Sequence, residues 1–195
     1  VVQTTFIRHS HNDEMEIWYT LTGDIEKKAA QEAIQWINGE LYSKPVTRLR
    51  MLIASSGGDI DSGVNLHTYL KALPFEVETI GFGKVDAAAI PIFLGGKRRL
   101  AVDGCQFFFH EGRYNIEDNT APIHVFEEII SVFKRDLHET IHIIARETGN
   151  DTEVVATMLR RSKIMTALEA RDFGLCHSII MELPLQQQEE IGFKI

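Results

Sequence analysis

Two kinds of feature are missing from this sequence. No apolar run approaches the roughly 18 residues that a membrane-spanning helix needs, so we expect no membrane span. Basic residues are in the minority, with 20 Lys and Arg against 28 Asp and Glu and a net charge of −8. A general nucleic-acid binder presents a basic face to the phosphates, so nucleic acid is not an expected partner.

Cysteine is also scarce. Cys105 and Cys176 lie outside any C-x-x-C motif, and we interpret them as free thiols in a reducing compartment. Residues 1–9 lack the basic and apolar segments of a signal peptide, although the sequence does not begin with Met. We therefore expect a cytoplasmic protein. The patterns G-x-x-x-x-G-K-[ST] and G-x-G-x-x-G are absent as well, and we expect neither a cofactor nor a metal.

The length and composition are those of one globular domain. The chain has 195 residues, of which 44% are hydrophobic and 25% are charged, which is ordinary usage for a folded protein. Because no linker or fixed repeat divides the chain, we expect a single domain over residues 1–195. Residues 1–14 are predicted to form an arm or loop, and residues 184–195 a loose tail.

Short apolar runs alternate with helical periodicities. Residues 50–54 are typical of a strand buried on both faces. Asp103-Gly104 is typical of a hairpin turn between two strands, and Asp24 is a suitable N-cap for the first helix. The expected strands are 16–21, 50–54, 77–82, 99–102, 106–110 and 178–181; the expected helices are 29–41, 61–73, 87–94, 122–149, 151–160 and one that begins with a capping box at 166–169. This alternation predicts an α/β domain with a mostly parallel sheet.

Three turns carry residues suited to chemistry. The segment Ser55-Ser56-Gly57-Gly58-Asp59 joins an expected strand to a helix, and its glycines allow backbone amides to approach a ligand. Such amides bind negative charge, as a phosphate site or as an oxyanion hole, while a plain tight turn is the alternative. A nucleophile could sit at the second strand-to-helix turn, 81–89, but positions 84–91 hold no Ser, Thr or Cys. His110 ends a third strand.

In their order and spacing these segments resemble the proteolytic subunit of the Clp protease, within the ClpP/crotonase superfamily. The resemblance runs from about Ile17 to Ile180. It rests on the glycine turn at 55–58, the small residues at 87–89, Gly-Lys-Arg-Arg at 96–99, the strand ending in His110 and the segment 166–175. It implies the ClpP/crotonase fold of stacked ββα units, with a "handle" of loop and long helix at about 112–149.

The resemblance also implies a role for each matching residue. Gly58 and Ala88 match the residues whose amides form the oxyanion hole, and His110 matches the general base. Ala87 stands where the family has its nucleophilic serine, and Ser162 where it has the catalytic aspartate. Alanine has no group that attacks a carbonyl, and a hydroxyl can orient an imidazole but cannot stabilise imidazolium by charge. The alternative acids are Asp86, Asp103, Glu111 and Asp172.

The implied function is that of a serine peptidase subunit, inactive in this chain, which cleaves peptide bonds inside an oligomeric chamber. We interpret Ala87 as an engineered replacement of serine, with a naturally inactive ring partner as the alternative. The implied partners are peptides or unfolded proteins, a Clp-type unfoldase ATPase, and further copies of the chain in a heptameric ring or stacked rings.

Two other classes stay open. A crotonase-like acyl-CoA enzyme would use carboxylates such as Glu111 and Asp86 for acid–base chemistry. A zinc hydrolase is suggested by His138-Glu139-Thr140-Ile141-His142, which matches H-E-x-x-H. No third zinc ligand is evident, and a polar face of the long helix is the simpler interpretation.

Overall fold

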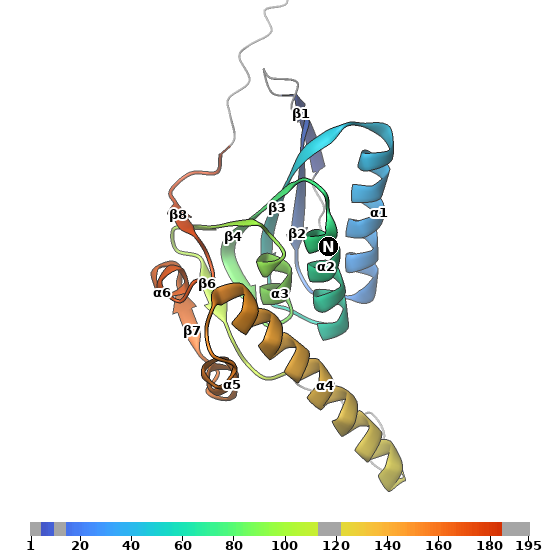
Figure 1. The fold of residues 1–195 in the computed structure, drawn as a ribbon, viewed down its shortest axis with the longest axis vertical. Helices are drawn as coiled ribbons and strands as arrows, with labels where there is room; N and C mark the ends of the chain where they lie inside the picture. Colours follow the sequence, from blue (N-terminus) through green and yellow to red (C-terminus); the bar gives the residue numbers. More distant parts are fainter. Residues whose placement is uncertain (1–4, 10–14, 113–121, 185–195) are drawn as a thin grey trace, which may run out of the picture.

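The computed structural model describes residues 5–9, 15–112 and 122–184. Within these ranges the strands form one eight-stranded sheet, and helices pack beside it (Figure 1). The elements in chain order are β1 (Thr5–His9), β2 (Met15–Thr22), α1 (Lys27–Ser43), β3 (Val46–Ser55), α2 (Ile60–Ala72), β4 (Glu76–Asp86), α3 (Ala89–Leu94), β5 (Arg98–Val102), β6 (Gln106–Phe108), α4 (Ile123–Thr148), α5 (Thr152–Arg160), β7 (Ile164–Thr166), α6 (Ala167–Asp172) and β8 (Ser178–Ile180).

The predicted α/β architecture with a mostly parallel sheet is confirmed. The main path of the sheet runs β1-β2-β3-β4-β5-β8, and every pair on it from β2 to β8 is parallel. A helix follows each of β2, β3 and β4, as parallel neighbours require a crossover connection. The carboxyl ends of β3, β4 and β6 therefore lie at the same edge of the sheet, which is where open α/β sheets bind ligands.

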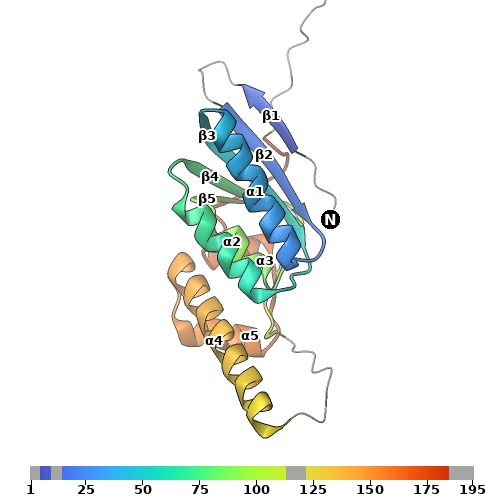
Figure 2. The same ribbon diagram turned by 90° about the vertical axis from the view of Figure 1, so that its right-hand side faces the viewer.

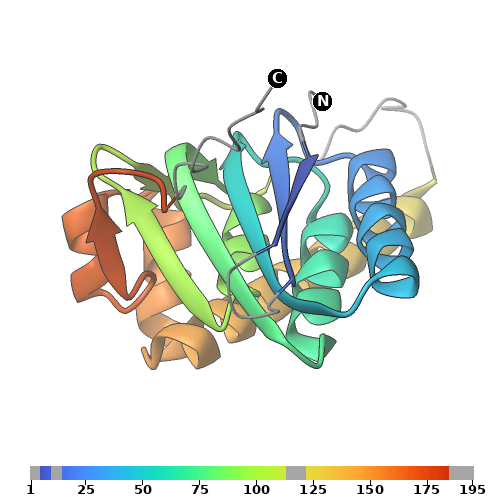
Figure 3. The same cartoon turned by 90° about the horizontal axis from the view of Figure 1, so that it is seen from above.

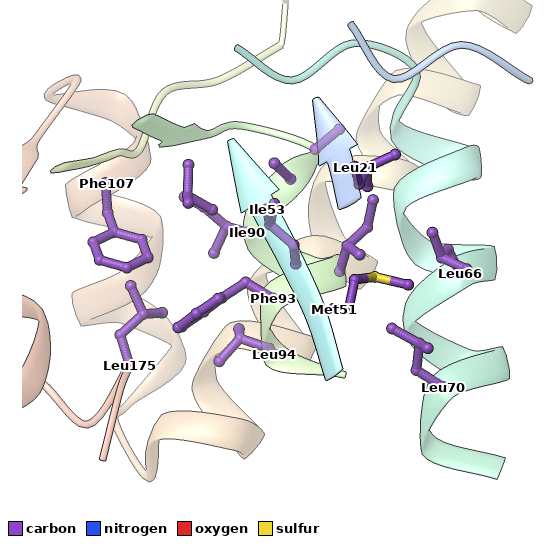
Figure 4. Packing of buried hydrophobic residues seen from close by; sticks show 14 of the residues in the cluster. Leu21, Met51, Ile53, Leu66, Leu70, Ile90, Phe93, Leu94, Phe107 and Leu175 are labelled. Carbon is purple, nitrogen blue, oxygen red and sulfur yellow. The ribbon is translucent and has the colours of Figure 1, made fainter. Parts of the chain in front are cut away.

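The core lies between the sheet and the helices. Figure 2 shows α1 and α2 in front of the strands, and Figure 3 shows α3 behind them from another direction, so these helices cover one face. Alternate residues of each strand point to that face, such as Met51 and Ile53 on β3 (Figure 4). Leu52 points the other way and packs with Trp18, Ile80 and Leu100 in a smaller cluster. Strand β3 is thus buried on both faces, as its apolar run predicts.

Two strand predictions were wrong. Residues 5–9 of the predicted arm form strand β1, which pairs antiparallel with β2. The strands on either side of Asp103-Gly104 do not form a hairpin, because both β5 and β6 pair parallel with β4 at successive positions along its length. The eleven residues of β4 are long enough to accommodate both.

The helix predictions also need two corrections. Glu26, not Asp24, precedes α1, and no side chain caps that helix; Asp24 instead accepts a 2.7 Å hydrogen bond from Ser56 Oγ. The apolar stripe of the long helix, α4, is buried only toward its C-terminal end. Its first turns extend beyond the sheet (Figures 1 and 2) and leave Ile123 and Ile130 exposed. The predicted loop from 113 to 121 and the tail from 185 onward lie outside the described residues.

Candidate active site

The glycine turn after β3 lies directly against the start of α3. Gly57 and Gly58 have φ values of +92° and +146°, which favour glycine. A Cβ on Gly57 would lie 2.8 Å from Ala87 Cβ and 3.1 Å from the Ala88 nitrogen, so the two turns touch. Ile25 holds the glycine turn, because its N–H donates to the Gly57 carbonyl (2.8 Å) and its carbonyl accepts from the Asp59 N–H (2.7 Å).

These hydrogen bonds leave two backbone amides unused. Among the described residues, no backbone hydrogen bond is formed by the N–H of Gly58 or by that of Ala88. Ala88 is the N-cap residue of α3, where an N–H has no partner within the helix. Both residues line the same cavity. An oxygen that develops negative charge there would find two donors ready for it.

Ala87 occupies a strained position between β4 and α3. Its φ of +47° lies in the left-handed region, which a residue with a Cβ rarely adopts. The surrounding structure maintains this conformation: the Ala87 N–H donates to the Phe108 carbonyl (3.0 Å), and the Ala87 carbonyl accepts from the Ile90 N–H (3.0 Å). A strained turn from strand to helix is the geometry that presents the nucleophile in α/β-hydrolases.

His110 follows β6 at the same edge of the sheet. Its Nδ1 lies 2.9 Å from the backbone carbonyl oxygen of Glu111. A carbonyl only accepts, so Nδ1 carries the proton and Nε2 of the neutral ring keeps its lone pair. The ring also packs on Phe108, with centroids 4.7 Å apart. The imidazole is therefore held in an orientation that leaves Nε2 as a base.

One cavity of about 410 Å³ contains all four of these positions. Its wall includes Gly58, Ala87, Ala88 and His110, contributed by the ends of three strands. Residues of α4, among them Phe133, line it as well. The structure therefore brings two amides that form no backbone hydrogen bond within the described ranges, one imidazole and one small side chain to a single cavity.

Comparison with known proteins shows the family of this chain. The family model described as Clp protease matches residues 10–182. The chain belongs to the Clp protease family. Its curated relatives include the ATP-dependent Clp protease proteolytic subunit 2 of Treponema pallidum, 28% identical over 167 residues, which are 82% of this chain and 80% of that protein. Subunit 3 of Rhodococcus jostii is 25% identical over 162 residues, 82% of this chain and 79% of that protein.

Solved structures of Clp proteolytic subunits and peptidases share the fold. A ClpP1 mutant from Listeria monocytogenes aligns with a TM-score of 0.72 at 22% identity, over 84% of this chain and 91% of that one. A peptidase from Plasmodium falciparum aligns with a TM-score of 0.71 at 21% identity, over 85% and 96%. The predicted ClpP-like fold is confirmed. No helix in the described ranges is long and apolar enough to span a membrane.

Ser162 lies across from His110 at the continuation of the antiparallel β6–β7 pair, because the Phe109 N–H donates to the Lys163 carbonyl (2.8 Å). It is exposed, has a φ of +53°, and lines a second cavity, of about 750 Å³, between α5 and β7. In the part of the chain that the structure describes, no hydrogen bond joins it to His110. Its role in orienting that imidazole stays a prediction.

The four alternative acids differ in their relation to His110. Asp103 is exposed in a turn, and Asp172 is paired with Arg171 at 2.9 Å on the surface. Glu111 contacts the ring through its backbone carbonyl. Asp86 is buried next to Ala87; burial raises the pKa of its carboxyl, while the Phe108 backbone, Lys84 and His110 act to lower it. Of the four acids, Asp86 is the buried one, and it lies next to the nucleophile position.

The zinc motif lies on the surface of α4. His138 and His142 are exposed, with their Nε2 atoms 3.0 Å apart. Among the described residues, no group of three or more potential ligands converges on a metal position. The structure therefore offers no support for a zinc hydrolase at this motif.

Sequence reasoning missed the polar residues that α4 contributes to the cavity. Asp136 and Thr140 line it together with Phe133 and Leu137. A signal was present, because Asp136 and Thr140 follow Phe133 by three and seven residues and so fall on the apolar stripe of the helix. A carboxylate within such a stripe indicates a polar partner or a ligand.

Proposed function

We propose that this chain is a ClpP-like serine peptidase subunit in which Ala87 replaces the nucleophile, so that it binds peptides without cleaving them. The observation that carries the proposal is the strained backbone of Ala87, in one cavity with two unused amides and the imidazole of His110. Strain of this kind costs roughly 1–3 kcal/mol and clusters at functional sites. An alanine side chain alone gives no reason to retain it.

With serine at position 87, the geometry supports acyl transfer. The serine hydroxyl would attack the scissile carbonyl while His110 Nε2 takes its proton and later returns it to the leaving amine. The amides of Gly58 and Ala88 would hold the oxyanion, each lowering the barrier by roughly 3–4 kcal/mol. We propose that the Glu111 carbonyl orients the imidazole and that Asp86 supplies the nearby negative charge, which the neutral hydroxyl of Ser162 does not.

The acyl-CoA alternative receives less support. Its acid–base chemistry is assigned from the sequence to Glu111 and Asp86, but of the described residues that line the cavity none is Glu111 or Asp86. Binding of a CoA thioester to the purified chain would reverse this preference.

The assembly is part of the proposal. The curated relatives are named ATP-dependent Clp protease proteolytic subunits, and α4 of this chain leaves Ile123 and Ile130 77% and 51% exposed. We propose that copies of the chain cover these residues in a ring or in stacked rings, with a Clp-type unfoldase ATPase as the source of unfolded substrate. Light scattering of the purified chain measures the assembly.

The test of the site is the Ala87→Ser variant with a fluorophosphonate probe. We expect one covalent label per chain, detected by intact mass, and peptide hydrolysis that the unaltered chain lacks. Adding His110→Ala to the serine variant should abolish the labelling, because the base is lost. A correctly folded Ala87→Ser protein that the probe does not modify would contradict the proposal.

Two origins of Ala87 predict the same inactive protein. In one, the alanine was introduced into an active parent, and in the other the natural subunit is an inactive ring partner. The genomic codon for position 87 distinguishes them: a serine codon supports the engineered replacement that we propose, whereas an alanine codon supports the natural partner.

A further inference from the structure

The cavity beside Ala87 has an extended apolar wall. Residues of α2, α3, α4 and α5 surround the space that a substrate side chain next to the scissile bond would enter. The apolar lining consists of Ile60, Ile90, Phe133, Leu137, Ile144 and Leu159. A lining of this kind accepts the hydrocarbon part of a ligand, and a few polar groups set its specificity.

The charged groups of this cavity are predominantly acidic. Asp59, Asp61 and Asp136 all line it. Asp59 is used within the chain, because its Oδ1 accepts from the Ser62 N–H at the start of α2. Arg135 donates to Asp136 Oδ1 (2.9 and 2.7 Å) and lies 3.7 Å from Asp61, but its own side chain is 62% exposed. The single positive charge of Arg135 can therefore balance only one of these three carboxylates.

Asp136 is the buried member of this group. The residue is 6% exposed, and both hydrogen bonds from Arg135 end on the same carboxylate oxygen. No hydrogen bond to its other oxygen, Oδ2, is formed by any residue in the described ranges. A buried carboxylate retains capacity for several donors, so this one can accept a further charged donor.

A second polar group lies one helical turn further along α4. The hydroxyl oxygen of Thr140 is fully buried and has no hydrogen-bond partner among the described residues. Thr140 lines the same cavity as Asp136. Unpartnered buried hydroxyls are rare in folded proteins, and a ligand that enters the site is one explanation for such a group.

We infer that this cavity selects a substrate side chain with an apolar stem and a cationic end, the chemistry of lysine, beside the scissile bond. The stem lies against the apolar wall, and the ammonium group donates to Asp136 and Thr140, both of which can accept. The inference rests on the proposed function, since it names the substrate class of that same site.

The test uses the Ala87→Ser variant and two quenched fluorescent peptides that differ only in lysine or norleucine beside the scissile bond. Norleucine has the same unbranched stem without the ammonium group. We expect kcat/KM to favour lysine by about 10-fold or more, as a hydrogen bond to a charged group suggests. Equal rates, or faster cleavage of the norleucine peptide, would overturn the inference.

Variants in the serine background locate the effect. Asp136→Asn should bring the lysine-to-norleucine ratio close to one, and Thr140→Val should lower it partly. Glu153→Gln removes a charge outside this cavity and should leave the ratio unchanged. Thr140→Val removes a hydroxyl without a partner, so it keeps the proposal testable even where Asp136→Asn unfolds the protein. An unchanged ratio in both cavity variants would refute the assignment.

A binding measurement separates this inference from the proposed function. Fluorescence anisotropy of the same two peptides, labelled at one end, measures binding to the unaltered chain. If Ala87→Ser is not modified by the fluorophosphonate, the proposed function fails, and tighter binding of the lysine peptide still supports the selectivity. If the variant is modified and both peptides bind equally, the inference alone fails.

Discussion

Replacing Gly58 with alanine probes the link between the glycine turn and Ile25. A Cβ at position 58 would overlap the Ile25 carbonyl oxygen and lie 2.9 Å from the Ile25 nitrogen. These are backbone atoms and cannot rotate away. The bridge between Ile25 and Gly58 would have to open, with loss of the hydrogen bonds that Ile25 forms with Gly57 and Asp59.

The magnitude follows from two contributions. A residue with a Cβ at a φ of +146° is strained by roughly 1–3 kcal/mol, and each of the two lost hydrogen bonds contributes about 1 kcal/mol. Gly58→Ala should therefore lower the free energy of unfolding by about 3–5 kcal/mol. Gly83 is a matched control, with a φ of +65° and no atom within 4 Å of an added Cβ; its change to alanine should cost only about 1–2 kcal/mol.

Equilibrium unfolding in urea measures the free energy of unfolding of both variants, Gly58→Ala and Gly83→Ala. In the Ala87→Ser background, the same Gly58→Ala change should slow fluorophosphonate labelling about 100-fold or more, because the displaced turn moves one of the two amide donors. The reasoning is refuted if Gly58→Ala is no less stable than Gly83→Ala, or if it labels at the rate of the serine variant.

Two further predictions concern stability. On the sheet face away from the helices, the Glu78 side chain is 1% exposed and its Oε1 lies 2.7 Å from Arg50 Nε, an ion pair without hydrogen-bond alignment. Glu78→Gln should cost about 1–3 kcal/mol in urea unfolding, because Arg50 loses one carboxylate partner but keeps Glu16, 2.9 Å from its Nη1; adding Arg50→Met should recover none of this loss, because it removes that remaining pair, and a double variant more stable than the single one would contradict this. Burial lowers the pKa of His67 below 6.5, so the unfolded chain binds the proton first, and the free energy of unfolding should fall as the pH drops below about 6.5 and level off at the folded pKa. His67→Gln should flatten this dependence, and an unchanged pH profile would count against it.

Local patterns predicted most of the elements. The apolar run of β3 is buried on both faces, and Thr166 caps α6 in a capping box with Glu169. Gly149 ends α4 with a φ of +75°. Each of these features depends on residues close together in the chain. Their conformational preferences are set by these neighbours and do not depend on the rest of the fold.

Pairing between distant segments could not be predicted in the same way. Asp103-Gly104 is compatible with a hairpin, but β5 and β6 each gain a parallel partner in β4. Strand β1 pairs with β2 although its sequence is mostly polar. Turn residues indicate only the local backbone conformation. Which strand a segment pairs with depends on which strand edges remain unpaired once the core has folded.

The amino-acid sequence by itself determined which residues can take part in chemistry: two glycines after a strand, an alanine where the resemblance to the Clp family implies a serine, and a histidine at a strand end. Only the tertiary structure decided which of them meet. It joined Gly58, Ala87, Ala88 and His110 in one cavity, placed Ser162 across from His110 where β6 and β7 pair, and added Asp136 and Thr140 from a helix distant in sequence. The physical reason is that a side chain's chemistry is local, while a cavity forms where separate elements pack against one another.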